Sequence, residues 1–151
     1  MRVETFRHSL ESGWNQELPR NLDSNQTLVL VFGAPEYREH PAALRELHEA
    51  FPTSHLLGCS TAGEILGNKI FDRSLVVAVA CFEATELAST SATISATSES
   101  LAAGEKIARD LNRPDLRGIH VLSEGSKVNG TALVQGINNG VDPKVIVTGG
   151  L

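Results

Sequence analysis

Four stretches of small and polar residues each follow an apolar run, and they hold most of the groups in this sequence that could bind a ligand. They are Gly33-Ala34-Pro35, Gly58-Cys59-Ser60-Thr61, Ser123-Glu124-Gly125 and Thr148-Gly149-Gly150. Apolar runs that end in this way are typical of buried strands, and parallel strands bring their carboxyl ends to one edge of a sheet. Small residues there let ligand atoms approach backbone N–H groups. The pattern predicts a ligand-binding rim, although a glycine after a strand is also ordinary turn chemistry.

The densest stretch runs from residue 58 to residue 65 and combines flexible backbone with compact donors. Its ligand-binding candidates are Gly58, Cys59, Ser60, Thr61, Gly63 and Glu64. Hydroxyl, thiol and N–H donors suit a carboxylate or an amide. The Glu64 carboxylate suits a ligand ammonium group, and it equally suits a cap or a solvent-facing position at a loop-to-helix junction.

An enzyme is the alternative interpretation of this stretch. Cys59 or Ser60 would be the nucleophile of an amide hydrolase, with one of the five histidines as its base. The sequence lacks the phosphate-binding P-loop, the G-x-S-x-G nucleophile elbow and the H-E-x-x-H metal motif. We therefore expect binding without chemistry, and no catalytic residue, metal or cofactor.

A second group of candidates lies in the last third of the chain, namely Ser123, Glu124, Gly125, Asn129, Gly130, Gly149 and Gly150. Asn129 is a good N-cap residue, so it either caps the next helix or contacts a ligand. Its closeness to the Ser123-Glu124-Gly125 turn favours a shared site.

The elements that would position these residues begin with a βαβ unit. The run from Leu28 to Phe32 is a strand buried on both faces, and Pro41 precedes a helical pattern that ends at Phe51. A short strand from His55 to Leu57 completes the unit.

The remaining elements predict an α/β fold with a mixed, mostly parallel sheet and helices packed on it. Ser74 to Phe82 and Leu87 to Ala96 are predicted to pair as an antiparallel hairpin. A helix from Leu101 to Leu111 has Ser98 as its candidate cap. The rest of the chain predicts a strand at 119–122, a helix from Asn129 to Gly140 and a strand at 145–147.

Composition limits the classes of function. The chain has 151 residues, a net charge of −5 and no basic run, which argues against nucleic acid as a partner. It has no apolar segment of transmembrane length and no signal-peptide core, so we expect no membrane partner and a cytoplasmic location. The length predicts one domain, and the stop directly after Gly149-Gly150-Leu151 predicts that this domain is truncated.

Together these motifs resemble the FIST N-terminal domain. The resemblance rests on Gly-Cys-Ser-Thr-Ala-Gly-Glu-Ile at 58–65 before a Val-rich strand, then on Ser123-Glu124-Gly125 with Asn129-Gly130, and on Gly149-Gly150-Leu151. It extends from about Leu28 to Leu151. Glu124 stands where the family often has aspartate, which changes the reach of that carboxylate.

The resemblance implies an intracellular sensory module of signal-transduction proteins that binds small ligands such as amino acids. It also implies a FIST C-terminal domain, absent from this chain, that would supply part of the pocket, and a signalling output domain as partner. Some bacterial members bind haem and respond to nitric oxide, so a haem-based gas sensor is one alternative. A protein-interaction scaffold, with the rim contacting a partner chain, is another.

Overall fold

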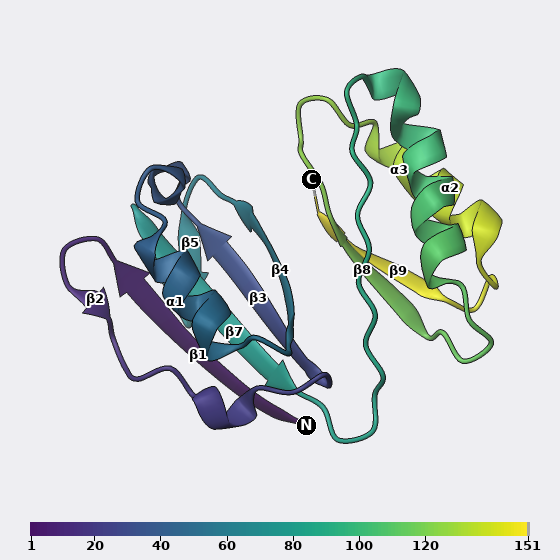
Figure 1. The fold of residues 1–151 in the computed structure, drawn as a ribbon. Helices are drawn as coiled ribbons and strands as arrows, with labels where there is room; N and C mark the ends of the chain where they lie inside the picture. Colours follow the sequence, from purple (N-terminus) through teal and green to yellow (C-terminus); the bar gives the residue numbers. More distant parts are fainter. Residues whose placement is uncertain (151) are drawn as a thin grey trace. The chain divides into compact units, whose positions relative to one another are not determined.

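The computed structural model of the chain describes residues 1–150, so Leu151 of the Gly149-Gly150-Leu151 motif lies outside the described residues. Contacts divide the chain into two compact units between Leu87 and Ala88 (Figure 1). Each unit has its own hydrophobic cluster. The α/β class with a mixed sheet is confirmed.

The first unit is built on a five-stranded sheet in the order β2-β1-β7-β3-β4. Its strands are β1 (Arg2–Ser9), β2 (Gly13–Trp14), β3 (Thr27–Gly33), β4 (His55–Ser60) and β7 (Ser74–Cys81). The β3–β4 pair is parallel, whereas β1–β2, β1–β7 and β3–β7 are antiparallel. The sheet is therefore less parallel than predicted, because β7 pairs antiparallel with β3 and the N-terminal segment adds two further antiparallel strands.

The predicted βαβ unit is confirmed as β3, α1 (Ala42–Ala50) and β4. Helix α1 begins after Pro41, ends before Phe51 and lies against one face of the sheet (Figure 1). Side chains of β3 alternate between buried and half-buried positions, so one face of this strand is fully covered, not both as predicted. The core of the unit includes Phe6, Val29, Leu47, Val77 and Val79, each with no exposed area.

The predicted hairpin of Ser74–Phe82 with Leu87–Ala96 is wrong. Strand β7 lies between β1 and β3, so both of its edges already carry ladder hydrogen bonds and neither can accept another strand. Residues 88–96 belong to the second unit, where they run without a strand ladder. Ala92 and Ile94 pack on the hydrophobic cluster of that unit.

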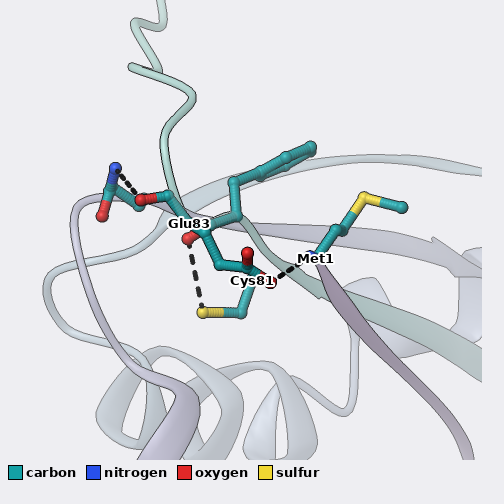
Figure 2. Close-up of polar contacts among 5 residues, drawn as sticks. Met1, Cys81 and Glu83 are labelled. Carbon is teal, nitrogen blue, oxygen red and sulfur yellow. Dashed lines mark hydrogen bonds and ion pairs between the residues drawn. The ribbon is translucent and has the colours of Figure 1, made fainter.

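The start of β1 is held beside the end of β7 by side-chain contacts. Figure 2 shows the Met1 amino group paired with the Glu83 carboxylate. The Cys81 thiol donates to the Phe82 carbonyl oxygen at 3.9 Å. The Gln26 side-chain amide donates to the Glu83 carbonyl at 3.4 Å. These contacts fix the start of β1 beside the end of β7, whose register pairs Arg2 with Cys81.

The second unit contains η3 (Thr97–Glu99), α2 (Ser100–Leu111), β8 (Gly118–Leu122), α3 (Gly130–Gly140) and β9 (Ile146–Gly150). Strands β8 and β9 are parallel, and α2 and α3 lie together on one side of them (Figure 1). The predicted strand at 119–122 and the helix from Asn129 to Gly140 are confirmed. The predicted strand at 145–147 exists as β9, but it continues to Gly150, so residues 148–150 pair with β8 and do not form a turn after the strand. The predicted Ser98 cap is wrong, because Ser98 lies inside η3 and α2 begins two residues later.

Helices α2 and α3 approach so closely that side chains would not fit at their crossing. A Cβ on Gly104 would lie 2.2 Å from the Leu133 carbonyl oxygen and 3.0 Å from the Gly136 Cα. A Cβ on Gly140 would lie 2.6 Å from that of Ala108. Small residues at spacings of four on both helices are thus required by the packing of this unit.

Among residues 1–150, no helix is long and apolar enough to cross a membrane.

Candidate functional site

The four small-residue stretches lie at two pairs of strand ends in two different sheets. The predicted end of the strand before Gly58 is wrong, because β4 continues through Ser60 in register with β3. Strands β3 and β4 end together in the first unit, and β8 and β9 end together in the second. We call residues 58–64 with Gly33 the first rim, and residues 123–130 with Gly149 and Gly150 the second rim. The expected single edge with four strand ends is therefore replaced by two rims, one in each unit.

The first rim is held by backbone pairing at its base. Gly33 and Ser60 are register partners at the ends of β3 and β4, and the Thr61 N–H donates to the Gly33 carbonyl at 2.9 Å. The chain then turns through Ala62 and Gly63 into β5 (Glu64–Leu66), which forms a hairpin with β6 (Lys69–Phe71).

A buried carboxylate closes this turn onto β7. Glu64 is 1% exposed, and its Oε1 accepts from the Thr61 hydroxyl at 2.8 Å. Its Oε2 accepts from both the Ser74 N–H at 3.1 Å and the Ser74 hydroxyl at 2.8 Å. The predicted cap or solvent-facing position at the start of a helix is wrong, because Glu64 begins strand β5 and its carboxylate is buried against Thr61 and Ser74. Both oxygens are used to hold the first residue of β7 against the turn.

The surroundings of the other first-rim candidates do not point to a ligand. A Cβ on Gly58 would lie 2.3 Å from the Val31 carbonyl oxygen, so the approach of β4 to β3 by itself requires glycine. Gly63 would accept a Cβ at 3.6 Å from its nearest neighbour, Ile70, which is ordinary contact. Ser60 is exposed. Cys59 is half-buried, and burial raises the pKa of its thiol, which disfavours the reactive thiolate.

Sequence reasoning missed an aromatic cluster beside the first rim. Tyr37, in η2 (Pro35–Arg38) just after β3, is 2% exposed and donates its hydroxyl to the His8 carbonyl at 3.1 Å. The Tyr37 Oη also lies 2.8 Å from His8 Nδ1. Burial, aided by the charge of Glu64, raises the pKa of Tyr37 to about 12. The signal available in the sequence was its single tyrosine, two residues after the Gly33-Ala34-Pro35 turn.

The second rim has a polar atom that the fold does not satisfy. Leu122 and Gly150 are register partners, and the Ser123 N–H continues the ladder by donating to the Gly150 carbonyl at 3.0 Å. The Ser123 Oγ is buried and has no hydrogen-bond partner among residues 1–150. Buried hydroxyls in native proteins are nearly always paired, so an unpaired one marks a position that a ligand or water could complete.

Glu124 organises the loop that leaves β8. Its carboxylate accepts from the Ser126 N–H at 2.9 Å, from the Ser126 hydroxyl, and from the Lys127 N–H at 2.6 Å. Hydrogen bonds from Ser126 hold the pKa of Glu124 below its ordinary value, so this exposed side chain is charged at neutral pH. Gly125, also exposed, lies inside the turn that Glu124 closes.

Asn129 is the N-cap of α3, which confirms the capping role predicted for it. Its Oδ1 accepts from the Ala132 N–H at 3.0 Å, and its own N–H donates to the Ser100 hydroxyl at 2.9 Å. The second bond ties the start of α3 to the start of α2. Gly130 is the first residue of α3, where an α-helix leaves N–H groups without intrahelical partners.

The two glycines of β9 differ in what they require. Gly149 has a φ of +147°, and a Cβ there would lie 1.8 Å from the Val121 carbonyl oxygen, so no other residue fits beside β8. A Cβ on Gly150 would have no neighbour within 4 Å. The structure therefore brings Ser123 and Gly150 together at the strand ends, and it leaves space beside Gly150.

The family assignment follows from these elements and from one comparison. The model of the FIST N domain matches residues 27–151, from the first residue of β3 through β9. The chain belongs to the FIST N domain family. The match crosses both compact units, so both rims lie inside the family's domain. FIST domains are generally sensory, signal-transduction domains. No curated protein and no solved structure matches the chain.

Proposed function

We propose that this FIST N domain senses a small, amino-acid-like metabolite, and that the second rim is its principal binding surface. The observation that carries the proposal is the buried, unpartnered Ser123 Oγ at the carboxyl end of β8, next to the end of β9. Open α/β sheets bind their ligands outside the carboxyl ends of parallel strands.

The groups of the second rim complement the two charged ends of an amino acid. The first turn of α3, beginning at Gly130, offers N–H donors and the positive end of the helix dipole to a carboxylate. The Ser123 hydroxyl would give that carboxylate a further donor. The Glu124 carboxylate is charged and exposed, and it would face the ammonium group.

Sensing requires only that the ligand binds one conformation better than another. In this proposal the bound ligand favours one packing of the domain against the FIST C-terminal domain, and the signal passes to an output domain in the cytoplasm. The ligand leaves chemically unchanged. The raised pKa of Cys59 supports binding over amide hydrolysis, because the thiolate that hydrolysis needs is disfavoured.

The test is a titration of the ¹⁵N-labelled chain with each of the twenty amino acids at millimolar concentration, followed by amide chemical shifts. We expect at least one amino acid to shift amides at 122–125, 129–132 and 149–150 in a saturable manner, while amides at 58–64 stay in place. If none of the twenty moves the second-rim amides, or if saturable shifts appear at 58–64 instead, the assignment of this rim is wrong.

A second candidate function, contact with a partner protein, has an observation in its favour at the first rim. Ile65 and Ile70 are register partners on the β5–β6 hairpin and are 67% and 74% exposed. Paired exposed isoleucines beside a closed polar network suit a protein contact better than a polar ligand. The double substitution Ile65→Ser with Ile70→Ser should weaken association with the FIST C-terminal domain and leave the amino-acid titration unchanged. Unchanged association would remove this candidate.

A further inference from the structure

The second unit has a hollow of about 580 Å³ at the amino ends of β8 and β9. It lies between the turn that enters β8, residues 112–117, and the turn that enters β9, residues 142–145. The second rim is formed at the carboxyl ends of the same two strands. The hollow is therefore a separate location, and the proposed sensory function makes no use of it.

The charge in this hollow is predominantly positive. Arg113, Arg117 and Lys144 line it, against one carboxylate, that of Asp142. Asp115 belongs to the first turn but does not line the hollow. The second unit as a whole contains six Lys and Arg and six Asp and Glu, so half of its cations gather in this one place.

None of these three cations is neutralised by the described part of the chain. The ion pairs of residues 1–150 involve the Met1 amino group, Arg2, Arg73 and Lys106, and the side chains of Arg113, Arg117 and Lys144 take part in no ion pair or hydrogen bond there. The Asp142 carboxylate instead accepts from the Lys144 backbone N–H at 2.8 Å, which makes it part of its own turn.

Backbone hydrogen bonds fix both turns and join them. The Leu116 N–H donates to the Arg113 carbonyl at 3.1 Å, and the Val145 N–H donates to the Asp142 carbonyl at 2.9 Å. The Ile146 N–H crosses to the Arg117 carbonyl at 3.1 Å. The positively charged side chains thus extend from a backbone that is already ordered, which lowers the entropy cost of holding a ligand.

We propose that this hollow binds a small organic molecule that carries a phosphate group. The two guanidinium groups can each donate a planar, bidentate pair of hydrogen bonds to phosphate oxygens, and the ammonium group adds a third positive charge. Leu116 and Val145 line the same hollow and offer apolar contact to the organic part. The volume falls in the range of small-molecule sites, roughly 300–1,000 Å³. The domain would then have two inputs, an amino-acid-like ligand at one end of β8–β9 and a phosphorylated ligand at the other.

The probe for this site is inorganic pyrophosphate, titrated into the ¹⁵N-labelled 151-residue chain at low ionic strength. Saturable shifts are expected for amides of residues 112–117 and 142–145. Arg113→Gln and Arg117→Gln should each weaken binding about tenfold, the usual effect of losing a charge-assisted hydrogen-bonded contact. Arg117→Lys should give an intermediate loss, because it keeps the charge and loses the planar fork.

Arg109→Gln is the matched control, since it removes one positive charge from the last turn of α2 without touching the lining. Its affinity for pyrophosphate should stay within twofold of that of the unaltered chain.

Equal weakening of pyrophosphate binding by Arg109→Gln, or the absence of saturable shifts at the two turns, would show that the proposed binding site is wrong. A hexaglutamate peptide that binds these turns more tightly than pyrophosphate would overturn the ligand class. Amide shift dispersion of each variant shows that it has folded. Failure here leaves the amino-acid titration at the second rim unaffected.

Discussion

The two rims of this domain both lie at the carboxyl ends of parallel strands, and they differ in whether every buried polar side chain has a hydrogen-bond partner. In the first rim, Thr61, Glu64 and Ser74 satisfy one another in a buried network. In the second, the Ser123 hydroxyl is buried without a partner among the described residues, and the Glu124 side chain is exposed. Small polar residues at the end of a strand can therefore form a closed hydrogen-bond network that stabilises the fold, or they can leave a polar group available to a ligand. The distinction depends on whether another element supplies the partners. Strand β7 does so for the first rim.

The largest expected effect is the loss of stability when the Thr61–Glu64–Ser74 hydrogen-bond network is broken. Glu64→Ala would leave the Thr61 hydroxyl and both Ser74 donors without acceptors in a buried place, so we expect a loss of about 3–5 kcal/mol in the free energy of unfolding. Urea denaturation followed by Trp14 fluorescence measures it, because the only tryptophan lies in the first unit. Exposed Glu11→Ala is the control and should change the free energy by less than about 0.5 kcal/mol. A similarly small effect at Glu64 would show that the network does not hold the rim.

The next effect tests whether the packing of α2 against α3 stabilises the second rim. Gly104→Ala would force α2 and α3 apart at their crossing, and overpacking of this kind costs about 1–3 kcal/mol. Hydrogen exchange should increase across residues 100–150, while the Trp14 unfolding transition stays in place. Exposed Gln135→Ala on α3 is the control and should leave exchange unchanged. A shifted Trp14 transition would mean that the two units do not unfold independently.

A smaller effect is the pH dependence of the first unit. Burial lowers the pKa of His8 from its ordinary value of 6.5, so below that pH the unfolded chain binds a proton that the folded chain resists. The melting temperature of the first unit should fall as the pH drops through 6.5 toward the folded pKa. His8→Gln should reduce this slope, and exposed His40→Gln should not. An unchanged slope in the His8 variant would assign the pH dependence to other groups.

Sequence patterns correctly predicted the elements that depend on residues close to one another in the sequence. The two ends of α1, the cap of α3, the βαβ unit and the end of β8 all follow from local residue types. Strand β1 was missed because Phe6 is the only large apolar residue on its inward face, between Glu4 and His8. Once β1 is present it occupies the free edge of β7, and the predicted hairpin with residues 87–96 becomes impossible.

The sequence indicated which segments hold the candidate residues. It did not show which polar side chains in those segments have hydrogen-bond partners in the folded chain. Glu64 accepts from Ser74, ten residues later, and the end of β8 pairs with Gly150, which is 27 residues beyond Ser123. No local pattern shows which polar side chain will find its partner through such contacts. The Arg113, Arg117 and Lys144 hollow is similar, because two turns well separated in the sequence meet there.

The most direct test of the contrast between the rims is a paired substitution at its two serines. Ser74→Ala removes a hydroxyl that donates to Glu64, whereas Ser123→Ala removes one that donates to no described residue. In urea denaturation of the ligand-free chain, followed by amide signals of both units, we predict that Ser74→Ala lowers the free energy of unfolding of the unit that contains it by about 1–3 kcal/mol. Ser123→Ala should leave that of its own unit unchanged within about 0.5 kcal/mol or raise it, while weakening any amino acid bound at the second rim. An equal loss at both positions would contradict the account, because it would show that Ser123 already has a partner in the folded chain.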